Sequence, residues 1–98
     1  MTGKAFADYV KLFHTSRRQS ISSKQLDLKF GVKSSQIRKV VNRLRIGVTP
    51  ICSYEYGYFY AETHAELEET VLQLRSRMKQ IVAAEQGLSK ILHQKTTY

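Results

Sequence analysis

The chain has 98 residues, which is enough for one small domain and leaves little for a second. A single cysteine excludes an intrachain disulfide and a cysteine-rich metal site. No apolar run approaches the ~18–20 residues that span a bilayer, and no signal-peptide core follows Met1. We therefore expect a soluble protein of the cytoplasm, associated with the nucleoid if it is bacterial, with no cofactor.

The net charge of +8 is large for this length, and it is unevenly distributed. Residues 1–50 contain eleven Lys and Arg against two Asp, whereas residues 51–98 contain five Lys and Arg against six Glu. A general solubility charge is one explanation. A basic half beside a near-neutral half is more typical of a surface that binds a polyanion.

The first half of the chain predicts three helices. An apolar stripe indicates a helix over about residues 4–16, and its members are Phe6, Tyr9, Val10 and Phe13. Arg17 and Arg18 follow in a polar connector, either as a solvated loop or as a phosphate clamp. A second helix should begin near Ser22 or Ser23, bury Leu26 with Leu28 or Phe30, and end at Gly31.

The third helix is predicted from Ser34, as its N-cap, to Gly47, with an apolar stripe made of Ile37, Val40, Val41 and Leu44. The opposite face carries Ser35, Arg38, Lys39 and Asn42, with Gln36 and Arg43 on its flanks. Arg and Lys can donate to guanine, and Asn can pair with adenine. Lys33 and Ser34 lie at the helix N-terminus, which favours a phosphate. A solvated face is the alternative, although no acidic residue occurs between Lys33 and Arg45.

A β-hairpin is expected next, with strands at 48–53 and 58–61 and a turn at 54–57 that depends on Gly57. Pro50 restricts the first strand to an edge, and Cys52 suits the core better than catalysis. Tyr54 and Tyr56 could donate to phosphate oxygens, but Glu55 between them would repel phosphates.

The last helix is predicted from a capping box, Thr63 with Glu66, to about His93. It carries apolar residues that alternate by four and three, as in a two-stranded coiled coil. We expect its first turns to pack on the domain of residues 1–62 and the later part of 63–98 to form a homodimer. The expected dimer contacts are Val71, Leu74, Met78, Ile81, Leu88 and Leu92. Glu85 and Gly87 interrupt this pattern.

Three helices, a hairpin and a further helix make a mainly α fold with a small β-hairpin. This order resembles the winged helix-turn-helix family over about residues 4–74. The turn Phe30-Gly31-Val32-Lys33-Ser34 and the basic helix after it carry the resemblance. The segment GVTPICSYEYGYFYA looks like the wing of biotin-repressor-type domains. A long dimerising helix after the wing resembles replication-terminator and PadR-type regulators and small phage or mobile-element proteins. The resemblance implies double-stranded DNA as the partner, with the third helix in the major groove.

Enzymatic function finds little support in the sequence. His14, His64 and His93 lie on different segments, without the spacing of a metal site or a catalytic triad. No glycine-rich phosphate loop or serine nucleophile motif is present. We therefore expect a dimeric, sequence-specific DNA-binding regulator. The alternative is a winged-helix module that docks on a host protein or nuclease through its tyrosines.

Overall fold

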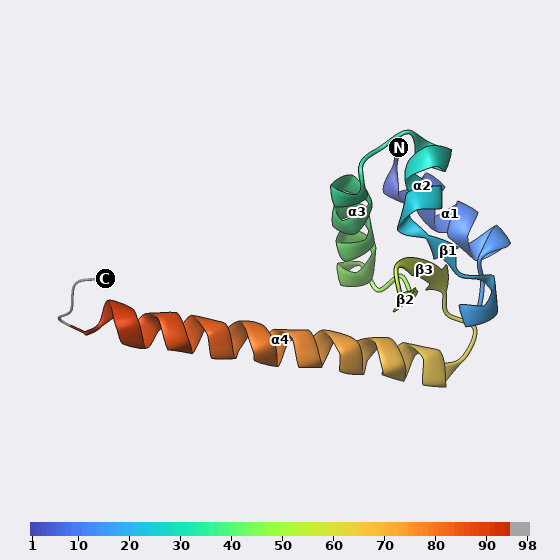
Figure 1. The fold of residues 1–98 in the computed structure, drawn as a ribbon. Coiled ribbons are helices and arrows are strands. Elements are labelled where there is room, and N and C mark those ends of the chain that lie inside the picture. Colours follow the sequence, from blue (N-terminus) through green and yellow to red (C-terminus); the bar gives the residue numbers. More distant parts are fainter. Residues whose placement is uncertain (95–98) are drawn as a thin grey trace. The chain divides into compact units, whose positions relative to one another are not determined.

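The computed structural model describes residues 1–94 and confirms a mainly α fold with a small sheet and a long C-terminal helix (Figure 1). In chain order the elements are α1 (Gly3–Phe13), η1 (Arg17–Gln19), β1 (Ile21–Ser22), α2 (Ser23–Phe30), α3 (Ser34–Ile46), β2 (Ile51–Tyr54), β3 (Gly57–Tyr60) and α4 (His64–Leu92). The chain forms two compact units, and each is described by itself below. The first unit is Met1–Glu68, and the second, from Glu69 onward, contains the rest of α4.

The sheet has three antiparallel strands in the order β1-β3-β2, where the sequence predicted only a hairpin. The additional strand, β1, pairs Ile21 with Tyr58 and Ser22 with Gly57. It was missed because two residues after a polar connector are too short to show an alternating pattern. The connector itself contains the short 3-10 helix η1.

The hairpin is shorter than predicted. Its first strand begins at Ile51 and not at Val48, because Val48 has a φ of 61°, which is incompatible with an extended strand. Tyr54 pairs with Gly57, so the turn consists of Glu55 and Tyr56. Glu55, with a φ of 51°, supplies the left-handed conformation of this turn.

Gly57 was predicted to supply the turn, and that prediction was wrong. It lies in β3 without a positive φ, between β2 and β1. A Cβ atom at this position would overlap the carbonyl group of Ile21. Glycine is therefore required here by the close approach of β1.

The core of the first unit is formed by apolar side chains from the three helices and the sheet. Its buried members are Phe6, Val10, Ile21, Leu26, Ile37, Val41 and Ile51. Phe30 packs on this core, with its ring 5.8 Å from that of Phe6, whereas Leu28 is 79% exposed. Phe13, predicted as part of the apolar stripe of α1, is 60% exposed.

The helix caps agree with the sequence at most positions. The Ser22 hydroxyl accepts a hydrogen bond from the Gln25 N–H, and Gly31 ends α2 with a φ of 64°. Gly47 follows the last residue of α3 as predicted. The exception is the start of α3, where Lys33, and not Ser34, occupies the N-cap position and no side chain caps the helix.

Candidate nucleic-acid interface

The third helix presents a polar, cationic face to solvent. Its buried residues, Ile37 and Val41, pack into the core and so turn the opposite side outward. The side chains on that side are exposed, namely Ser35, Gln36, Arg38, Lys39, Asn42 and Arg43. None of these six side chains bonds to another residue in the described part of the chain. The predicted recognition residues of α3 therefore lie together on one accessible face.

Arg45 belongs to a different part of α3 from these cations. Its Nε donates to the Ile51 carbonyl oxygen over 2.8 Å, and its Nη2 donates to the Ser53 hydroxyl over 2.6 Å. Both bonds tie the end of α3 to β2. The sequence did not predict this role of Arg45, although Arg45 follows Val41 by four residues and hence lies on the core-facing side of α3.

The start of α3 is less cationic than the sequence suggested. Lys33 is exposed there, but the Ser34 hydroxyl donates to Asp27 Oδ2 over 2.6 Å. The Asp27 carboxylate thus lies beside the first turn of α3. A phosphate at this helix N-terminus would meet a negative charge as well as free N–H groups.

The arginines of η1 differ from each other. The Arg17 guanidinium stacks on the Tyr54 ring, 4.9 Å from its centroid, and the Arg17 N–H donates to Glu66. Arg18, in contrast, is exposed. Two residues predicted separately, Arg17 and Tyr54, are therefore brought together by the fold, apart from the α3 face. Arg18 is the more accessible of the two arginines for a phosphate.

The hairpin tip is held against α2. The N–H and the hydroxyl of Ser23 both donate to the Tyr56 carbonyl oxygen, over 2.9 Å and 2.8 Å. The Tyr56 side chain itself is 88% exposed. Because the tip is anchored in this way, the residues of the turn that it presents to solvent are Tyr56 and its neighbour Glu55.

A groove of about 320 Å³ runs beside the cationic face of α3. It is lined by Met1, Val32, Gln36, Lys39, Val40 and Arg43. The lining combines two cations, Lys39 and Arg43, with aliphatic side chains, which suits a mixed polar and apolar contact. Gln36, Lys39 and Arg43 belong both to this groove and to the exposed face of α3.

The Glu66 carboxylate accepts several hydrogen bonds from segments on both sides of the sheet sequence, as follows. Oε2 accepts hydrogen bonds from the Ser16 hydroxyl and the Arg17 N–H, and Oε1 accepts from the N–H groups of Glu62 and Thr63. Thr63 in turn caps the Glu66 N–H, which confirms the predicted capping box. Burial raises the pKa of Glu66, but these hydrogen bonds outweigh it and hold the pKa below its ordinary value.

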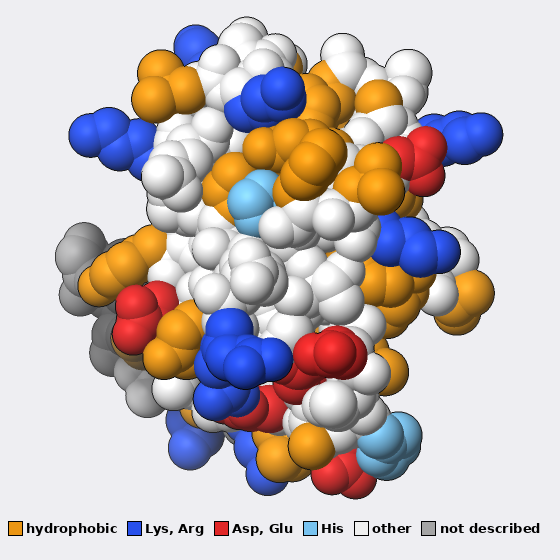
Figure 2. Space-filling view, turned by 90° about the vertical axis from the view of Figure 1, so that its right-hand side faces the viewer, with side chains coloured by type: hydrophobic (Ala, Val, Ile, Leu, Met, Phe, Trp, Pro, Cys, Tyr) orange, Lys and Arg blue, Asp and Glu red, His pale blue; other side chains and the backbone are white. Residues whose placement is uncertain are grey.

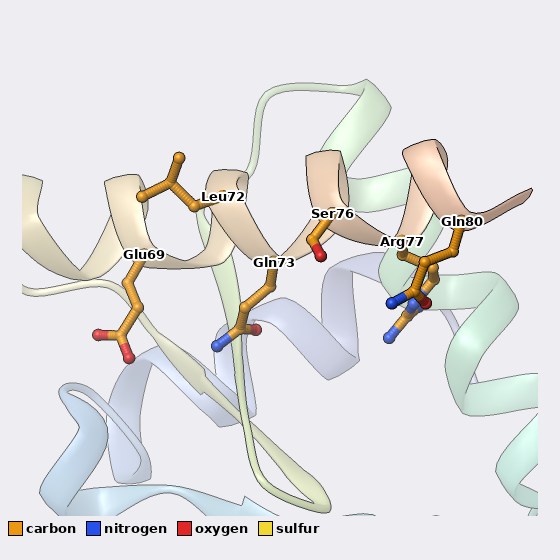
Figure 3. A pocket seen from close by; sticks show the side chains of 6 residues that line it. All are labelled: Glu69, Leu72, Gln73, Ser76, Arg77 and Gln80. Carbon is orange, nitrogen blue, oxygen red and sulfur yellow. The ribbon is translucent and has the colours of Figure 1, made fainter. Parts of the chain in front are cut away.

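The predicted seam of α4 is exposed to solvent within the single chain. The exposed fraction is 42% for Val71, 39% for Leu74, 58% for Met78, 62% for Ile81, and 69% for both Leu88 and Leu92. Figure 3 shows another set of α4 side chains, Glu69, Leu72, Gln73, Ser76, Arg77 and Gln80, which line an open pocket on the helix surface. All six come from α4 alone, so they do not enclose a ligand.

Among residues 1–94 no group of three or more His, Cys, Asp or Glu side chains could hold a metal ion. No helix within that range is long and apolar enough to cross a membrane. On the side of the molecule seen in Figure 2, Lys and Arg side chains are interspersed with acidic and apolar ones. No protein-family model matches the sequence, and comparisons with curated proteins and with solved structures give no match.

Proposed function

We propose that the protein binds double-stranded DNA in a sequence-specific manner, through the exposed face of α3. The observation that carries this proposal is the absence of internal partners on that face. Arg38, Lys39 and Arg43 are exposed, and no acidic residue occurs in α3 to neutralise them. Exposed cations can bind the phosphates of DNA, and these cations together with the Asn42 amide can form hydrogen bonds with the edges of its bases.

In this proposal the residues of α3 have distinct roles. Arg38 and Lys39 donate to guanine O6 and N7, and Asn42 pairs with adenine N6 and N7. Ser35, Gln36 and Arg43 on the borders of the face contact bases or phosphates. Arg18, in the connector after α1, and Tyr56, at the hairpin tip, add contacts to phosphate oxygens. Glu55 keeps the hairpin a minor contributor, since its charge repels the DNA backbone.

We further propose that the protein acts as a homodimer, joined through the α4 seam, and regulates transcription or a mobile element inside the cell. The exposed apolar residues of α4 support self-association, because a monomer would leave this row in water. A two-fold dimer presents two copies of α3 to two half-sites.

Fluorescence anisotropy with a varied pool of labelled duplexes tests DNA binding. Affinity should fall with salt concentration, with a log–log slope of about −0.9 per phosphate contacted. Replacing Arg38 and Lys39 together with Gln should weaken binding at least about tenfold, since two contacts of ~1 kcal/mol or more are lost.

The matched control is the replacement of Lys79 and Lys90 with Gln. It removes the same charge from exposed positions of α4 and should change affinity little. If the two double variants lose affinity equally, affinity depends on net charge alone and α3 does not contact the bases. If the wild-type protein binds no duplex at low salt, the proposal that it binds DNA is wrong.

A protein-docking module is the second candidate. It is favoured by the exposure of apolar and aromatic side chains on the first unit, where Val48 is 90%, Tyr56 88% and Ile46 76% exposed. In that case Tyr56→Ala would abolish binding to the partner, and the replacement of Arg38 and Lys39 would not.

A further inference from the structure

Glu85 is the one charged residue in the apolar seam of α4. In heptad terms Val71, Met78, Glu85 and Leu92 share position a, and Leu67, Leu74, Ile81 and Leu88 share position d. Among residues 1–94 the one partner of the Glu85 carboxylate is the Ser89 hydroxyl, which donates to Oε1 over 2.8 Å. A second copy of α4 on this seam must therefore accommodate a carboxylate.

In a parallel, in-register dimer Glu85 lies opposite the Glu85 of the partner subunit. The position that flanks it there is position g, occupied by Ala84, which carries no charge. Two carboxylates would then face each other inside an apolar seam, which disfavours the ionised form of both.

In an antiparallel dimer a cationic side chain lies beside Glu85. When two α4 helices cross midway between Lys79 and Gln80, each a residue meets a d residue of its partner. Leu67 then lies opposite the partner's Leu92, Val71 opposite the partner's Leu88, Met78 opposite the partner's Ile81, and Leu74 opposite the partner's Glu85. This one register uses the whole seam. Arg75, which follows Leu74 at position e, comes alongside the partner's Glu85.

We infer that α4 pairs with a second copy of itself in the antiparallel direction, and that reciprocal ion pairs between Glu85 and the partner's Arg75 determine this direction and register. The inference rests on the self-association proposed above and does not depend on DNA binding. Two-fold symmetry forms the ion pair twice in each dimer. The helix dipoles also align favourably only in this direction.

A charge swap tests the ion pair. Glu85→Arg and Arg75→Glu, each alone, place like charges together and should raise the dimer dissociation constant at least about tenfold, whereas the double variant should recover to within about threefold of the wild type. The control is Arg77→Glu, which changes the same charge at position g, away from the partner's Glu85. It should not rescue Glu85→Arg. Equal rescue by both swaps would overturn the pairing.

Disulfide trapping tests the direction independently. Val71→Cys and Leu88→Cys variants carry different tags. Each variant is oxidised alone, and a mixture of the two is oxidised in parallel. The wild type is the control for the buried Cys52. An antiparallel dimer brings the two new thiols together across chains and yields only the mixed disulfide. In a parallel dimer these residues are about 25 Å apart along the axis, and each variant cross-links to itself.

The possible results separate the two proposals. Self-cross-linking of either variant overturns the antiparallel pairing and leaves dimerisation and DNA binding intact. A wild-type protein that sediments as a monomer at high micromolar concentration overturns both the pairing and the proposed dimer. The anisotropy titration still measures DNA binding by itself in that case.

Discussion

Single residues of this protein have roles that depend on what lies next to them in space. Cys52 is fully buried, as its apolar neighbours suggested. Arg45, in contrast, looks like one more cation of a basic helix, yet it bonds to β2. Asp27 reduces the positive character of the α3 N-terminus, although it precedes Ser34 by seven positions. Residue type alone therefore overestimates the cationic surface of the first half of the chain.

Gly57 gives the sharpest prediction at the residue scale. Gly57→Ala should lower the free energy of unfolding by about 1–3 kcal/mol, because the methyl group must displace the backbone of β1. Urea denaturation followed by circular dichroism measures this loss. The control is Gly87→Ala, where a Cβ atom would meet no other part of the described chain beyond the backbone of its own helix within 4 Å and the helix should gain about 1 kcal/mol. An unchanged stability for Gly57→Ala would show that β1 does not pack as described.

At the scale of elements, Glu66 joins the beginning of α4 to the segment that follows α1. Its carboxylate accepts from Ser16 and Arg17, about fifty positions earlier in the chain, as well as from its own helix cap. These hydrogen bonds hold the first turn of α4 to the segment that follows α1, within the first unit. A connection of this kind depends on the carboxylate remaining ionised.

The pH dependence of stability should show this connection. The folded pKa of Glu66 lies below its ordinary value of 4.5. The stabilisation is therefore present above the ordinary value and is lost as the pH falls through the folded pKa. At pH 7 Glu66→Gln should cost about 1 kcal/mol, and the difference from wild type should shrink as the pH falls below the ordinary value of 4.5.

Urea titrations at several pH values measure this difference. The control is Glu68→Gln, since Glu68 is exposed and its one described contact is with His64, at 3.8 Å. It should differ little from wild type at any pH. A cost for Glu66→Gln that stays constant down to pH 3 would mean that the charge of Glu66 does not stabilise the fold.

For the whole molecule, we expect the exposed seam of α4 to determine the oligomeric state. Ile81→Asp should give a monomer whose first unit stays folded, because the charge would be buried without a partner in a dimer. Leu72→Asp is the matched control, since the two side chains are equally exposed, at 62% and 61%, but Leu72 lies outside the seam. Light scattering measures both variants. Loss of the dimer in both variants would mean that the interface is not the heptad seam.

Much of the fold could be predicted from short stretches of sequence. The helix ends at Ser22, Gly31, Gly47 and Thr63 depend on residues within one turn of the cap, and the apolar stripe of α3 depends on spacing along one helix. The exposed face of α3 follows from the same periodicity. These features are local, so the sequence by itself determined them.

Only the tertiary structure decided the features that join distant segments. The pairing of β1 with β3, the glycine at position 57, and the choice of Phe30 over Leu28 for the core all depend on which elements meet. The hydrogen bonds of Arg45 and Glu66 cross between elements in the same way. Such contacts have no period along the chain, because their geometry is determined by packing between elements and not by the helix or strand repeat.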